Sequence, residues 1–227
     1  MPLQWRFATP TGALPPGWER ESVLGRAIAV GLLAACSAAA QDAIYFERVF
    51  PGSIPDRFEV RLTVDGVATY SQDGEDSVDY EVGPQEAAPL FEWAAELGYF
   101  SKPVASKRKV ASTGRKLLRY ESGGQARGEA AFDYTEVPAA RELASWFVRL
   151  AETQQFLQTL ERLYRFDRLG VDQALVSLES AFERDRIVAP GLLEPILNQI
   201  ADQDRIVHVA RARARGMLER IHASRSK

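Results

Sequence analysis

The chain has 227 residues, 46% of them hydrophobic and 10% aromatic, and its 28 basic and 31 acidic side chains leave a formal net charge of −3. This composition can form a substantial core, which excludes an intrinsically disordered protein. A single Cys excludes a disulfide framework, and one Cys with two His offers too few soft ligands for a structural zinc site, so we expect neither a metal nor another cofactor.

Residues 1–40 have the pattern of an export signal. Arg26 precedes an uncharged apolar run, and small residues follow it up to Ala40, in the order that secretory signals show. The uncharged run from Ala27 to Ala40 has 14 residues, fewer than the roughly 20 that a helix needs to span a bilayer. We therefore predict an exported protein without a permanent transmembrane helix.

Two cleavage sites are compatible with this signal. The residues Ala38-Ala39-Ala40 suit ordinary signal peptidase, which would release a periplasmic protein. The segment 33–36, Leu-Ala-Ala-Cys, resembles the lipobox of bacterial lipoproteins, in which Cys36 is lipidated and becomes the first residue. The expected location is therefore the periplasm, or the membrane through a lipid anchor if Cys36 is modified.

Residues 41–135 have the pattern of an antiparallel sheet with one packed helix. In the segment 57–65 apolar and polar residues alternate, which is the period of a strand with one buried face. Asp65-Gly66 suits a tight turn to the next strand. The helix is indicated by the spacing of apolar residues between Leu90 and Leu97. Strands are expected at 44–50, 57–65, 67–70, 77–82, 115–122 and 125–134.

From Glu136 onward the apolar residues recur in steps of three and four, which predicts helices. The first should be long, and Thr153 is the one interruption of its apolar stripe. Helices are expected at 136–165, 171–182, 190–200 and 206–221. The predicted fold class is therefore α+β: an antiparallel β-sheet with a packed helix over 41–135, then an all-helical bundle over 136–227 with a basic C-terminal helix.

Several segments resemble a family of uncharacterised exported bacterial α+β domains. They are Phe58-x-Val60-x-Leu62-x-x-Asp65-Gly66-x-x-x-Tyr70, the helix that ends Leu97-Gly98-Tyr99-Phe100, and the helix after Phe132-Asp133-Tyr134. The resemblance covers about residues 44–152 and implies the fold and export. Where the family has a Cys-x-Gly-x-Cys-Pro turn, this chain has Phe50 and Ile54 in place of the cysteines. No redox or metal role therefore carries over.

A basic cluster surrounds the segment Ser112-Thr113-Gly114, and no acidic residue lies between Glu96 and Glu121. Guanidinium and ammonium groups together with backbone N–H groups could bind a phosphate or a carboxylate there, although the spacing is not that of a P-loop. The alternative is a solvated hairpin edge that its lysines protect from aggregation. The candidate anion-binding residues are Lys107, Arg108, Lys109, Arg115 and Lys116.

The C-terminal 23 residues carry seven basic and one acidic side chain, or +6, whereas residues 41–204 carry 18 basic and 28 acidic side chains, or −10. A basic helix could dock on anionic lipid, but we expect this one to pair with the acidic remainder of its own chain. We expect no nucleic-acid partner, because an exported protein rarely meets one. His208 and His222 are 14 residues apart, or about 21 Å along a helix, so we expect two separate surface histidines.

No sequence motif indicates a reaction. The Gly-x-Ser-x-Gly pattern is absent, and Glu92 and Glu96 share a helical face as ordinary surface carboxylates do, so we name no catalytic residue. The expected function is a noncatalytic binding or scaffolding protein of the bacterial cell envelope, with another envelope protein as partner. The alternatives are a periplasmic hydrolase with an unrecognised site and a basic-helix module docking on anionic lipid. A deep pocket that collects Glu, Asp and His would favour the hydrolase, and a flat apolar patch would favour a protein partner.

Overall fold

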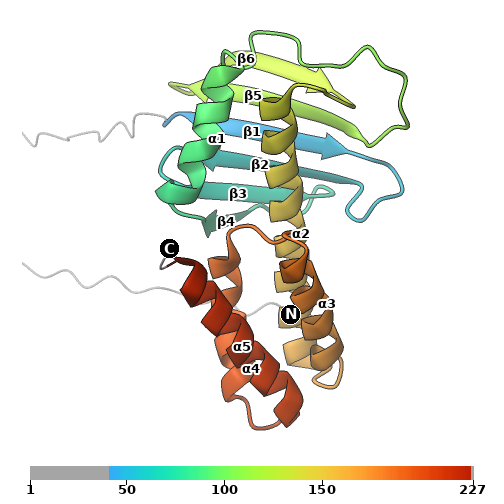
Figure 1. Cartoon of the computed structure of the whole chain (residues 1–227), viewed down its shortest axis with the longest axis vertical. Helices are drawn as coiled ribbons and strands as arrows, with labels where there is room; N and C mark the ends of the chain where they lie inside the picture. Colours follow the sequence, from blue (N-terminus) through green and yellow to red (C-terminus); the bar gives the residue numbers. More distant parts are fainter. Residues whose placement is uncertain (1–40, 226–227) are drawn as a thin grey trace, which may run out of the picture. The chain divides into compact units, whose positions relative to one another are not determined.

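The computed structural model describes residues 41–225. Six strands form one antiparallel sheet in the order β4-β3-β2-β1-β5-β6 (Figure 1). The strands are β1 (Ala43–Val49), β2 (Arg57–Thr63), β3 (Val67–Gln72), β4 (Val78–Glu81), β5 (Arg115–Ser122) and β6 (Gln125–Phe132). The helices are α1 (Pro84–Glu96), α2 (Pro138–Phe166), α3 (Val171–Glu183), the 3-10 turn η1 (Pro190–Leu193), α4 (Glu194–Asp202) and α5 (His208–Arg225). This arrangement confirms the predicted α+β fold. The expected export signal and Cys36 lie outside the described residues.

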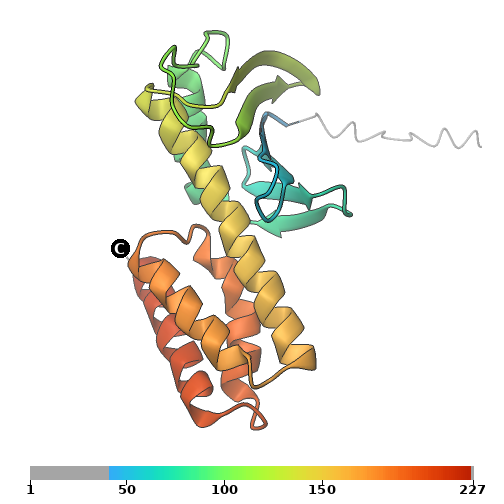
Figure 2. The ribbon, with the colours of Figure 1, turned by 90° about the vertical axis from the view of Figure 1, so that its right-hand side faces the viewer.

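The sheet has one face covered by helices, and its side chains follow the period that the sequence predicted. Phe58, Val60 and Leu62 of β2 are buried, whereas Arg57, the first residue of the strand, is exposed. Figure 2 shows α1 and α2 on the same side of the sheet. The buried faces of the strands therefore form the first hydrophobic core against these two helices.

The turn between β2 and β3 needs a glycine. Gly66 has a φ of +87°, and a Cβ added to it would lie 2.2 Å from the carbonyl carbon of Gly83. The Gly66 carbonyl accepts hydrogen bonds from the N–H groups of Val82 and Gly83 at 2.9 and 3.2 Å. The predicted Asp65-Gly66 turn thus also fixes the end of β4, where α1 begins.

Helix α2 belongs to two hydrophobic cores. Its first half packs on the sheet, where Phe147 stacks on Phe46 of β1 with ring centroids 5.0 Å apart. Its second half, from Leu160 onward, packs against α3, α4 and α5 in the second core. The apolar period changes near Glu136, as predicted, but the division between the cores falls later, inside α2, because one continuous helix supplies side chains to both.

The helix expected at 190–200 consists of two pieces. Residues Pro190–Leu193 form the 3-10 turn η1, and α4 begins at Glu194 with Pro195 in its first turn. Proline suits that position because its missing N–H would have no intrahelical partner there. The sequence therefore predicted the end of this segment to within two residues, since α4 ends at Asp202, and missed the break within it.

Candidate functional site

Two of the five candidate anion-binding residues, Arg108 and Lys116, bond groups of their own chain. Arg108 pairs with Glu136, whose Oε1 lies 2.9 Å from its Nη1, while Lys107, Lys109 and Arg115 are exposed. Strand β5, which carries Arg115 and Lys116, lies between β1 and β6, and the edge strands of the described sheet are β4 and β6.

The Lys116 ammonium donates hydrogen bonds to backbone oxygens of its own chain. Its Nζ donates to the carbonyl oxygens of Thr113, Gly114 and Asp133 at 3.2, 3.0 and 2.9 Å, and to Thr113 Oγ1 at 2.9 Å. Burial lowers the pKa of the Lys116 ammonium, the nearby Arg48 lowers it further, and Asp133 opposes the shift. An ammonium has three donors, so these oxygens satisfy it without an external anion.

The arginines of α5 also bind their own chain. Arg213 and Arg220 share the carboxylate of Glu179 on α3. Arg211 Nη1 lies 2.8 Å from Asp204 Oδ1, and Arg215 donates to the carbonyl of Ala201 at 2.8 Å. These contacts confirm the expected pairing of the basic helix with the acidic body, with a backbone oxygen in place of an acid at Arg215.

The histidines lie singly on the surface. His208 and His222 are both exposed, as predicted, and His222 Nε2 lies 3.9 Å from Glu194 Oε2. Within residues 41–225, no group of three or more His, Cys, Asp and Glu side chains is placed to hold a metal ion.

A cleft of about 630 Å³ lies where the β4–α1 turn meets the segment before α4. Glu81 and Glu86 line it together with backbone and small apolar groups, and its lining includes no histidine. Glu86 Oε2 accepts the N–H of Ala189 at 3.2 Å. This carboxylate therefore connects α1 to the bundle and does not stand free in the cleft.

The face of the sheet that α1 and α2 leave uncovered carries a continuous polar network. The Tyr45 hydroxyl donates to Glu59 at 2.7 Å, and Arg119 lies over the Tyr45 ring at 4.9 Å while its Nε donates to Glu129 at 2.9 Å. Burial and then Glu59 raise the pKa of Tyr45 above its ordinary range. Arg61 adds a pair with Glu121 at 2.8 Å. The polar side chains of this network therefore have hydrogen-bonding or charged partners within the network itself.

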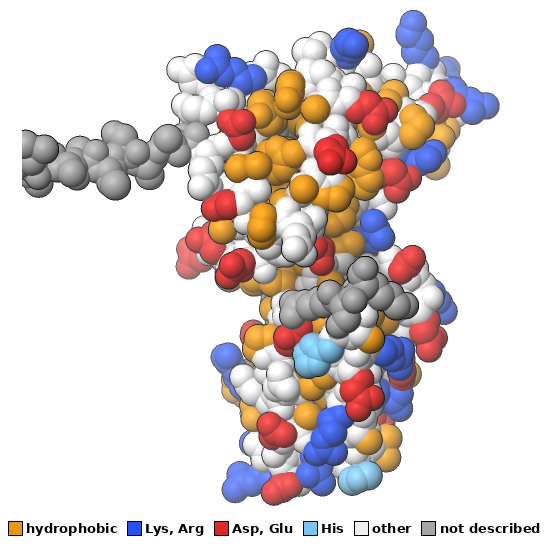
Figure 3. Space-filling model, turned by 60° about the vertical axis from the view of Figure 1, so that its left-hand side comes forward, with side chains coloured by type: hydrophobic (Ala, Val, Ile, Leu, Met, Phe, Trp, Pro, Cys, Tyr) orange, Lys and Arg blue, Asp and Glu red, His pale blue; other side chains and the backbone are white. Residues whose placement is uncertain are grey.

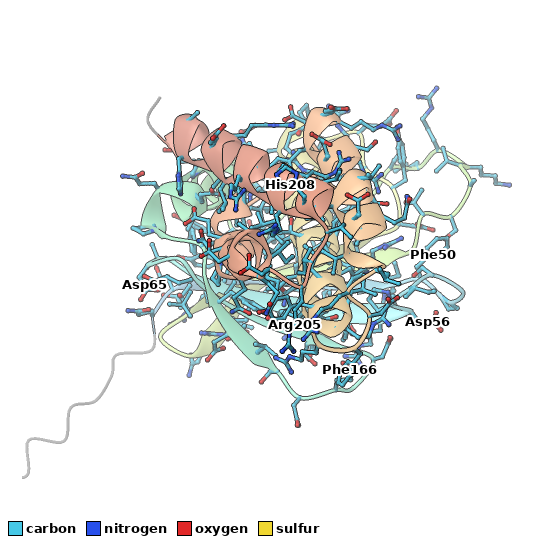
Figure 4. All side chains as sticks on the ribbon, turned by 90° about the horizontal axis from the view of Figure 1, so that it is seen from below. Phe50, Asp56, Asp65, Phe166, Arg205 and His208 are labelled. Atoms are coloured by element: carbon cyan, nitrogen blue, oxygen red, sulfur yellow. The ribbon has the colours of Figure 1, made fainter. Side chains whose placement is uncertain are left out.

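The most exposed large apolar side chains of the helical part lie at one end of the bundle. Phe166, the last residue of α2, is 83% exposed, and Leu169 in the following turn is 81% exposed. The α4–α5 loop lies beside this turn, since Gln203 Nε2 is 3.4 Å from the Tyr164 hydroxyl. Figure 4 looks onto this end and labels Phe166 and Arg205 on these two segments. We call this surface the bundle tip; it comprises Arg162, Arg165, Phe166, Arg168, Leu169 and Arg205.

The sequence reasoning missed the bundle tip, although a signal was present. The apolar stripe of α2 runs through Leu157, Leu160 and Tyr164, and Phe166 falls outside that spacing. Apolar side chains also gather over the sheet and α1 (Figure 3), but there Phe91 and Trp93 of α1 are half-buried against the first core.

Comparison with known protein families, with curated proteins and with solved structures finds no match. The resemblance over residues 44–152 therefore stays an expectation. Within residues 41–225, no helix combines the length and hydropathy required to cross a membrane.

Proposed function

We propose that this protein is an exported, noncatalytic binding module of the bacterial cell envelope and that it binds through the bundle tip. The observation that carries the proposal is the exposure of Phe166 and Leu169, three residues apart in the chain. Scattered single apolar residues are normal on a protein surface, whereas exposed apolar groups gathered at one place are typical of a surface that meets another molecule.

The ionisable groups support binding over catalysis. An active site needs a nucleophile, acid or base in a cleft with its partners within hydrogen-bond reach. Here Glu86 bonds a backbone N–H, Lys116 bonds carbonyl oxygens, and both histidines are exposed. These arrangements are what structural roles require.

Export belongs to the same proposal and rests on the sequence of residues 26–40. Labelling cells with a fatty-acid analogue and fractionating them tests it. A label that the Cys36→Ser variant loses supports the lipoprotein, and unlabelled protein in the periplasm supports the soluble form. Full-length chain in the cytosol would contradict both.

Binding through the bundle tip is tested by photo-cross-linking in cells. A photoreactive amino acid replaces Leu169 in one strain and Ile54 in another. Ile54 is the matched control, because it is 91% exposed and belongs to the loop between β1 and β2. A defined protein or lipid adduct at position 169 that position 54 does not give supports the proposal, and equal labelling at the two positions contradicts it.

A further inference from the structure

The arginines of the bundle tip differ from those of α5. Neither an ion pair nor a hydrogen bond joins the side chain of any of the four bundle-tip arginines (Arg162, Arg165, Arg168 and Arg205) to a residue of 41–225. The Nε of Arg168 is buried without a partner. Three arginines of α5, by contrast, are neutralised by acids of their own chain: Arg211, Arg213 and Arg220. The arginines of the bundle tip therefore remain available to an external anion, unlike these three arginines of the most basic helix.

Two acids near the bundle tip, Asp167 and Asp204, act within the chain. Asp167 Oδ1 accepts the N–H of Gly170 at 3.2 Å, and Asp204 holds Arg211. Arg162 precedes Phe166 by four residues on α2, so the two side chains are neighbours on the helix surface. An arginine can lay its carbon chain along apolar surface while its guanidinium stays in water. The bundle tip thus combines two exposed apolar side chains with four arginines.

We propose that the bundle tip docks on anionic lipid, with Phe166 and Leu169 entering the headgroup region and the arginines contacting lipid phosphates. This inference rests on the proposed function and names the surface that the module binds. Guanidinium groups are complementary to phosphate, and anionic lipid attracts each nearby arginine.

The shape of the bundle tip favours lipid over a protein partner. It is formed by a helix end and a turn, and the described clefts are lined by other residues. A protruding Phe and Leu can enter a membrane interface directly, whereas a protein partner must provide a matching pocket.

Vesicle sedimentation tests the inference on residues 41–227, because both hydrophobic cores are formed by side chains between Ile44 and Ile221. The vesicles contain phosphatidylcholine alone or phosphatidylcholine with phosphatidylglycerol. We expect binding that requires phosphatidylglycerol and weakens as salt rises, since salt screens exposed charges. The double variant Phe166→Ser with Leu169→Ser should bind at least about tenfold more weakly. Arg162→Gln with Arg165→Gln should lose about fivefold per arginine.

Two controls separate docking from general effects. Ile54→Ser removes a similarly exposed apolar group of the β1–β2 loop, which is not part of the bundle tip, and should leave vesicle binding unchanged. Arg213→Gln with Arg220→Gln removes α5 charges that already pair with Glu179 and Asp172, and it should also retain binding. Circular dichroism verifies that each variant is folded.

The inference would be overturned if the folded wild-type protein did not bind phosphatidylglycerol vesicles even at low salt. It would also be overturned if Ile54→Ser lost as much binding as the double variant Phe166→Ser with Leu169→Ser. If the protein does not bind the vesicles but the photoreactive group at position 169 captures a protein in cells, the lipid inference is wrong and the proposed binding function stands. If position 169 gives no specific adduct but vesicle binding follows the expected pattern, the lipid inference stands and the cellular role is contradicted.

Discussion

The hydroxyl of Thr153 in α2 bonds both backbone groups of Val188, 35 residues further along the chain. Thr153 Oγ1 lies 3.3 Å from the Val188 nitrogen and 3.1 Å from its carbonyl oxygen, and 3.0 Å from the carbonyl oxygen of Arg149. The side chain is fully buried. Because a hydroxyl can accept one N–H and donate to a carbonyl, the one polar residue in the apolar stripe fixes the segment between α3 and η1 onto α2.

Thr153→Val should destabilise the protein by about 1–3 kcal/mol, because it preserves the shape of the side chain and leaves buried backbone groups of Val188 without their partner. Urea unfolding measures the change. Thr159→Val is the matched control: Thr159 is a half-buried residue of the same helix with no side-chain hydrogen bond in the described structure, and its substitution should change stability by less than about 0.5 kcal/mol. Equal effects of the two substitutions would contradict the role of Thr153.

Gln154, the next residue, is buried without compensation. Neither its Oε1 nor its Nε2 has a hydrogen-bond partner, and the side chain is fully buried. An unsatisfied buried amide costs about 1–3 kcal/mol, so Gln154→Met should raise the free energy of unfolding by about 1 kcal/mol or more. Gln158→Met, at a half-buried position of the same helix, should change it little. A clear loss of stability in Gln154→Met would contradict this account.

The sequence predicted the sheet and the helices well because their signals are local. Alternation over 57–65 and the Asp65-Gly66 pair depend on neighbouring residues, and the structure confirms a strand and a turn there. Thr153 could be recognised as an interruption of the helical stripe. Its partner Val188 could not, because no periodic pattern connects positions that meet only after the chain has folded back.

The candidate anion site also shows that local sequence does not reveal partners that lie far along the chain. Proximity in the sequence grouped five cations, but two of them bond groups far along the chain: Glu136 is 28 residues from Arg108, and Asp133 is 17 residues from Lys116. Like charges that are close in sequence therefore indicate a binding site only when distant acceptors leave them free. At the bundle tip the described acceptors do leave them free, and there an off-stripe Phe166 was the local signal.

Lys116→Met should destabilise the protein by about 1–3 kcal/mol, because the carbonyl oxygens of Thr113, Gly114 and Asp133 lose a charged donor. Thermal unfolding measures the change, and Lys107→Met, at an exposed position, should leave the Tm unchanged. The same assay tests anion binding. Phosphate and chloride at equal ionic strength should give the wild type the same Tm; a phosphate-specific rise that Lys116→Met abolishes would restore the anion site.

Acid should weaken the ion pairs that connect Glu179 of α3 to Arg213 and Arg220 of α5. Burial raises the pKa of Glu179, but hydrogen bonds and the charges of Arg213 and Arg220 outweigh it, so the pKa lies below its ordinary value of 4.5. A carboxylate with a lowered folded-state pKa stabilises the fold above its unfolded pKa and loses that contribution as pH falls through the folded value. The stabilisation by Glu179 should therefore be constant above about pH 5 and decline below the ordinary value.

Glu179→Gln isolates this contribution, because other carboxylates also titrate in acid. Near neutral pH the variant should be less stable than the wild type by about 1–2 kcal/mol, since two charge-assisted hydrogen bonds are lost from a partly exposed pair. Urea unfolding across the acid range should show that difference shrinking as pH falls, because the wild-type carboxylate becomes neutral like the amide. Glu183→Gln, at an exposed position of the same helix, should match the wild type throughout. A difference between Glu179→Gln and the wild type that persists unchanged in strong acid would mean that the two arginines do not act through the charge of Glu179.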